Sequence, residues 1–101
     1  MKYTEKSKIS TVDDVKAFFN YLIYECRIAF HPDDNFEDYV SVQDGQSVFP
    51  QKTSDIYNRL MNDSFDVCEK NGVDIYELGL TAIASGKGTY SKNIKHKTTQ
   101  Q

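Results

Sequence analysis

The chain of 101 residues contains no tryptophan and only two cysteines, two prolines and two histidines. Two cysteines are too few for a disulfide scaffold, and without a secretory signal they indicate a reducing compartment. The first residues lack the apolar stretch of such a signal, and no run approaches the ~18 apolar residues that a membrane span requires. We therefore expect a cytoplasmic protein with one domain, because this length does not supply two separate cores.

Basic residues are scarce in most of the chain. Residues 1–84 contain eight Lys and Arg against fifteen Asp and Glu, a balance of −7, whereas residues 85–101 contain four Lys and no acid. Binding to a nucleic-acid duplex needs clustered basic side chains, so only the tail could contribute to it. We interpret residues 86–101 as a disordered basic tail and residues 1–9 as a flexible arm, because both are polar.

Three segments carry apolar residues at helical spacing and predict a mainly α fold, a three-helix domain within residues 10–85. The first predicted helix covers residues 11–30, and Pro32 disfavours its continuation. The other two cover residues 52–71 and 74–84. Cys26 and Cys68 lie on the apolar faces of the first and second helices, where a free cysteine behaves as a small buried hydrophobe.

Local signals mark the ends of these helices. Ser10 or Thr11 can cap the first helix, and Asp74 can cap the third, because their side-chain oxygens accept hydrogen bonds from free N–H groups. Gly72 suits the left-handed end of the second helix. Gly79 weakens the third helix, so we expect it where another backbone approaches closely.

The segment between the first two helices is predicted to be a short β-hairpin or an irregular stretch. Asp44-Gly45 is typical of a two-residue turn, which would pair Val40 with Phe49. An isolated hairpin is marginally stable in water, so it should lie on the helices.

The first helix carries a second apolar stripe roughly opposite its core face. Its members recur at spacings that align on one side of a helix: Ala17, Tyr21, Tyr24 and Ile28. Tyrosine is frequent at protein contacts because its large ring can be buried while its hydroxyl stays hydrogen-bonded. We expect this stripe to be covered either by the hairpin or by another subunit in a homodimer.

The acidic segment after the first helix partly matches a calcium-binding loop. The matching residues include Asp33, Asn35, Glu37 and Asp44. The template needs glycine at its sixth position, which is Asp38 here, and no helix can begin directly after the loop. We interpret the segment as an acidic surface loop, with a cation site as the alternative.

No residue spacing matches a catalytic, cofactor or metal signature, so we expect a non-enzymatic protein without a cofactor or a small-molecule substrate. The sequence predicts an interaction or regulatory module of bacterial type that binds a protein partner, or a second copy, through the Tyr21/Tyr24/Ile28 face. The alternative is a nucleic-acid-associated factor that uses its basic C-terminal tail.

Overall fold

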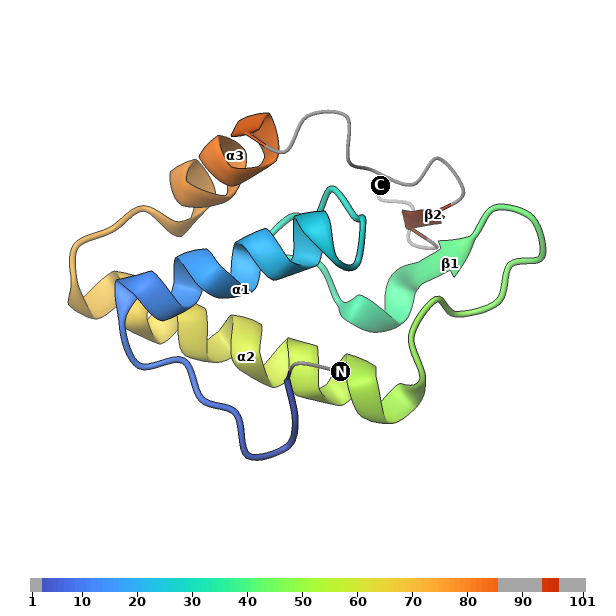
Figure 1. The fold of residues 1–101 in the computed structure, drawn as a ribbon, viewed down its shortest axis with the longest axis horizontal. Helices are drawn as coiled ribbons and strands as arrows, with labels where there is room; N and C mark the ends of the chain where they lie inside the picture. Colours follow the sequence, from blue (N-terminus) through green and yellow to red (C-terminus); the bar gives the residue numbers. More distant parts are fainter. Residues whose placement is uncertain (1–2, 86–93, 97–101) are drawn as a thin grey trace.

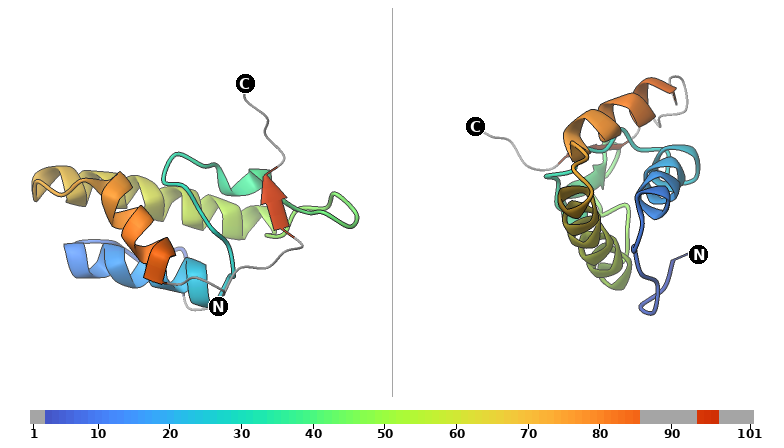
Figure 2. Two further views of the ribbon diagram at one scale, coloured as in Figure 1. Left: turned by 90° about the horizontal axis from the view of Figure 1, so that it is seen from above. Right: turned by 90° about the vertical axis from the view of Figure 1, so that its left-hand side faces the viewer.

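The computed structural model describes residues 3–85 and a short strand at residues 94–96, and it has the predicted mainly α fold. Its elements, in chain order, are α1 (Val12–Tyr24), the 3-10 turn η1 (Phe36–Asp38), β1 (Tyr39–Ser41), α2 (Gln51–Lys70), α3 (Ile75–Ser85) and β2 (Ile94–His96). The three α-helices lie at the corners of a triangle when the molecule is viewed from its end (Figure 2, right). Their inward faces enclose an aromatic core.

Helix α1 begins where the sequence predicted and ends six residues earlier. Thr11 and Asp14 form a reciprocal capping box, in which each side chain accepts a hydrogen bond from the other residue's backbone N–H. The prediction of a helix to Phe30 is wrong, because the helix ends at Tyr24 and Arg27 adopts a left-handed φ of 62°. The Ile28 N–H donates to the carbonyl of Leu22 at 3.2 Å. This bond gives a partner to one of the carbonyl groups that the end of the helix leaves free, and no glycine is needed for it.

The segment after α1 is extended and alternates between the core and the solvent. Ile28, Phe30 and Pro32 are buried, whereas the residues between them are exposed. This period of two is the pattern of an extended chain, not of the helix predicted to run as far as Phe30. The left-handed turn at Arg27 redirects the chain so that this alternation can place two large apolar side chains in the core.

The N-terminal arm, which we expected to be loose, packs across α1 and α2 (Figure 1). The Tyr3 ring is buried and meets the rings of Phe18 and Tyr21 edge-on, at centroid distances of 5.3 and 4.9 Å. Arg59 Nη2 donates to the carbonyl oxygen of Ser7 at 2.8 Å and to that of Glu5 at 3.2 Å. One guanidinium of α2 therefore fixes the backbone of the arm.

The segment between α1 and α2 has a different strand register from the predicted one. Val40 forms an isolated antiparallel bridge with Ser47 instead of Phe49, and the Gly45 N–H donates to the carbonyl of Ser41 at 2.8 Å. The predicted two-residue turn needs two successive left-handed residues, but of its two residues only Gly45 has a positive φ. The chain therefore makes a wider turn.

Strand β1 also pairs with β2, antiparallel, with Tyr39 opposite His96 and Ser41 opposite Ile94 (Figure 1). We did not predict a strand in the C-terminal segment. The rest of the predicted tail, residues 86–93 and 97–101, lies outside the residues that the structure describes.

Helices α2 and α3 agree closely with the predicted ranges. Gly72 follows the C-cap of α2 with a left-handed φ of 67°. At the start of α3, Asp74 Oδ1 accepts hydrogen bonds from the N–H groups of Tyr76 and Glu77 at 2.9 and 3.3 Å. At Gly79 the neighbours are side chains instead of the expected backbone: a Cβ atom there would lie 3.4 Å from Pro32 Cγ and 3.8 Å from a ring carbon of Phe30, which are ordinary van der Waals distances. The extended segment after α1 thus fixes the position of α3.

The left-handed backbone at Arg27 predicts the order of stability of two variants. Arg27→Gly and Arg27→Ala both remove the guanidinium, and the glycine variant should be more stable by about 1 kcal/mol, because alanine is strained at positive φ. Urea denaturation followed by circular dichroism measures the difference.

Asn20→Gly and Asn20→Ala provide the matched control, because Asn20 is an exposed position inside α1. There the alanine variant should be more stable by about 1 kcal/mol. The same order at both positions would mean that the helix continues through Arg27.

Candidate functional site

The structure separates the four residues of the predicted interaction face. Ala17 is exposed on α1, Tyr21 is half-buried, and Tyr24 is 47% exposed. Ile28 lies beyond the helix and is only 2% exposed, so it belongs to the core. These side chains therefore do not form one continuous apolar surface, and Tyr24 is the large side chain among them that remains accessible.

Tyr21 is covered by the arm and by α2, an arrangement that the sequence did not predict. Its hydroxyl lies 3.0 Å from the hydroxyl of Tyr57, and Cys26 Sγ donates to the same Tyr57 hydroxyl at 3.8 Å. Burial raises the pKa of the Tyr57 hydroxyl and also that of the Cys26 thiol. Both groups are therefore protonated at neutral pH, and a protonated thiol is a poor nucleophile.

The side chains of the acidic segment are engaged in separate hydrogen bonds with different parts of the chain. Asp33 Oδ1 accepts from the Tyr76 hydroxyl at 2.8 Å, whereas Asp44 Oδ1 accepts from the N–H of Gln46 at 3.0 Å. Asn35 Oδ1 accepts from the N–H of Glu37 at 2.9 Å. Within the described part of the chain, no three His, Cys, Asp or Glu side chains are grouped as metal ligands.

Asp34 stabilises this segment by bonding to a buried side chain. Its Oδ2 accepts from the buried Tyr39 hydroxyl at 2.6 Å and from the N–H of His31 at 2.9 Å. Burial is the main cause that raises the pKa of the Tyr39 hydroxyl, and the bond to Asp34 adds to it. Asp34 and Tyr39 thus join the segment after α1 to β1.

Helix α3 presents apolar side chains to solvent. Tyr76 is 42% exposed, Leu80 is 69% exposed, and Ala84 is also exposed. These three residues, which we call the outer face of α3, follow one another at intervals of four and align on one side of the helix. Glu77 is the single charged residue of α3. The signal was present in the sequence, because a surface helix normally carries more charge.

A groove of about 400 Å³ lies between α1 and α3 and connects Tyr24 with this region. Tyr24, Leu78 and Thr81 are among the residues that line it, and the Tyr24 hydroxyl donates to the carbonyl of Ser85 at 3.2 Å. Ala84 of the outer face follows Thr81 by three positions, so the groove and the outer face share an edge.

No protein-family model matches this chain, and no curated protein or solved structure shows significant similarity to it. Among the helices of the described residues, none combines the length and the apolar character needed to cross a membrane.

The different burial of Tyr24 and Ile28 predicts different costs of substitution. Ile28→Ser should lower the free energy of unfolding by about 3 kcal/mol, because it removes a buried apolar side chain and leaves a polar group in its place. Tyr24→Ser should lower it by about 0.5 kcal/mol, as is usual for an exposed position. Urea denaturation of both variants gives these values, and equal costs would contradict the assigned placement.

Proposed function

We propose that this protein is a non-enzymatic interaction module that associates with a second copy of itself through the outer face of α3. The observation that carries the proposal is the exposure of Leu80, which is 69% exposed at the centre of a helix that has a single charged residue. Contiguous apolar patches that stay exposed on a protein surface often mark sites of interaction.

The outer face of α3 is suited to a twofold contact with its own copy. If two α3 helices pack antiparallel with their Leu80 side chains in contact, each Tyr76 ring lies against the small Ala84 of the other copy. The two Glu77 carboxylates are then separated by about 9 Å along the helix axis, since each residue advances the helix by about 1.5 Å. The contact therefore buries apolar surface without placing like charges together.

Tyr24 extends this surface into the groove between α1 and α3. Tyr24 is the residue of the predicted interaction face that the proposal keeps, because its ring is accessible while its hydroxyl is hydrogen-bonded to the carbonyl of Ser85. Tyrosine contributes a large ring with few rotatable bonds, which favours its use at protein contacts. Ile28 has no part in the proposal, since it is buried.

The alternative function, association with nucleic acid through the basic tail, depends on residues that are mostly outside the described part of the chain. It stays a prediction from composition, and deletion of residues 86–101 tests it by the loss of salt-dependent binding.

The proposed contact predicts the solution mass of the wild type and of one variant. Light scattering in a dilution series should show wild-type protein at twice the chain mass of 11.6 kDa. Leu80→Lys should be monomeric. The substitution should raise the dissociation constant of the dimer at least about 100-fold, because both copies lose a leucine that the contact buries. Circular dichroism should show that the variant remains helical.

Val42→Lys is the matched control, because Val42 is another exposed apolar residue, 44% exposed, in the turn that follows β1. It should dimerise as the wild type does. A wild-type mass of 11.6 kDa throughout the series, or a Leu80→Lys dimer, contradicts the proposal.

A further inference from the structure

Ser54 of α2 is a buried polar residue without a visible hydrogen-bond partner. Its side chain is 1% exposed, and no described residue forms a hydrogen bond with its hydroxyl. Ser64, which is buried in the same helix, shows the usual arrangement, since its hydroxyl donates to the carbonyl of Leu60 at 2.9 Å. Buried polar groups in folded proteins nearly always have a partner, so the Ser54 hydroxyl requires an explanation.

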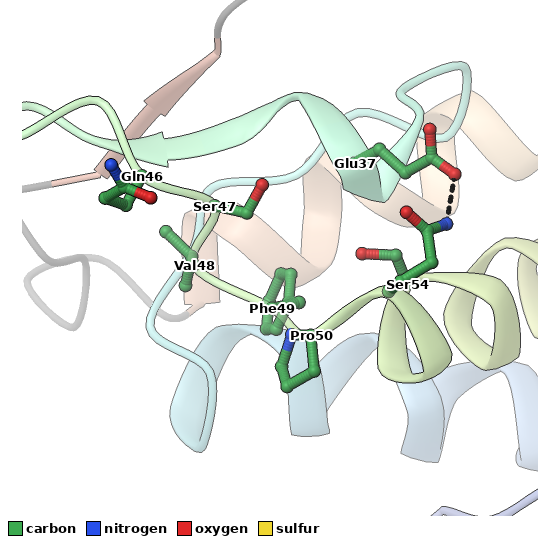
Figure 3. A pocket seen from close by; sticks show the side chains of 8 residues that line it. Glu37, Gln46, Ser47, Val48, Phe49, Pro50 and Ser54 are labelled. Carbon is green, nitrogen blue, oxygen red and sulfur yellow. Dashed lines mark hydrogen bonds between the residues drawn. The ribbon is translucent and has the colours of Figure 1, made fainter.

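The Ser54 side chain lines a cavity of about 530 Å³ at the N-terminal end of α2 (Figure 3). The cavity lies between the start of the helix, the chain leading into it and η1. This volume is within the range of small-molecule sites. A hydroxyl that has no hydrogen-bond partner among the described residues and that borders such a cavity can pair with a hydrogen-bonding group of an occupant.

Four other side chains that line the cavity are polar, and one of them is charged. They are the carboxylate of Glu37, the amides of Gln46 and Gln51, and the hydroxyl of Ser47. No lysine or arginine is among the lining residues, so the side chains offer no cation to an anionic ligand. Gln51 Nε2 donates to Glu37 Oε2 at 2.6 Å, which occupies part of the one carboxylate.

An apolar surface completes the cavity on one side. Phe49 is half-buried against Tyr57, at a ring-centroid distance of 5.2 Å, and it lines the cavity together with Pro50. Hydroxyl and amide groups both donate and accept hydrogen bonds, and beside an aromatic ring they match a ligand with several hydroxyl groups and an apolar C–H face.

We propose that this cavity binds a neutral polyhydroxylated small molecule, of the sugar or polyol class, with one ligand hydroxyl paired to Ser54. The Glu37 carboxylate disfavours an anion, and its bond to Gln51 leaves it as an acceptor for ligand hydroxyl groups. The site is independent of the outer face of α3.

Titration of the full chain, labelled with ¹⁵N, tests the proposal by nuclear magnetic resonance. The probes are D-glucose, D-galactose and glycerol, each added separately. At least one should cause saturable shifts of backbone amides around Gln46 and Ser54. Ser54→Ala should weaken that binding at least about tenfold, because the paired ligand hydroxyl loses its partner.

Ser64→Ala is the matched control, since it makes the same change in the same helix at a serine that already has a partner. It should bind the probe as the wild type does. Without probe, Ser54→Ala should melt at a higher temperature than the wild type, because it removes an unpaired buried hydroxyl. Ser47→Ala, at an exposed position, should weaken binding without affecting folding.

Three results would overturn the proposal. The first is the absence of saturable shifts with every probe. The second is saturable binding of inorganic phosphate at the same amides without binding of the sugars, which would assign the cavity to anions. The third is equal binding of the probe by the wild type and by Ser54→Ala.

Discussion

The packing of aromatic rings around Tyr57 is the interaction on which the rest of the structure depends. Its ring on α2 meets Phe18 of α1, Phe36 of η1 and Phe49 of the chain before α2, at centroid distances of 6.0, 5.5 and 5.2 Å. Its hydroxyl lies 3.0 Å from that of Tyr21, which Tyr3 of the arm covers. Four segments of the chain thus meet at the Tyr57 side chain, and the arm joins them through Tyr21. Aromatic contacts of this kind contribute beyond the area they bury.

The position of α3 depends on a second feature, the early end of α1. Because the chain turns at Arg27, the Pro32 ring lies next to Gly79 of α3. Gly79 and Ile75 therefore face the core, and Leu80 faces the solvent. The surface that we propose for self-association thus results from the same turn that removes Ile28 from the predicted face.

Local rules predicted much of the fold and little of the candidate sites. Thr11, Gly72 and Asp74 mark helix ends because each acts on backbone groups within a few residues of itself. Ile28 was misplaced because its spacing from Tyr21 and Tyr24 fits a helix, while the alternation through Phe30 and Pro32 fits an extended chain. Leu80 was overlooked, although the low charge of its helix was visible in the sequence. Ser54 gave no signal, because a missing partner is not a property of one residue.

The sequence alone determined the class of fold, the ranges of α2 and α3, and the caps, because hydrogen bonding within a helix depends on neighbours about four residues away. Only the tertiary structure decided which apolar residues are exposed and which polar groups lack partners. Those outcomes depend on contacts between distant residues, such as Tyr3 with Tyr21 or Arg59 with Ser7. Burial depends on the packing of whole elements, so a pattern on one helix cannot show what covers it.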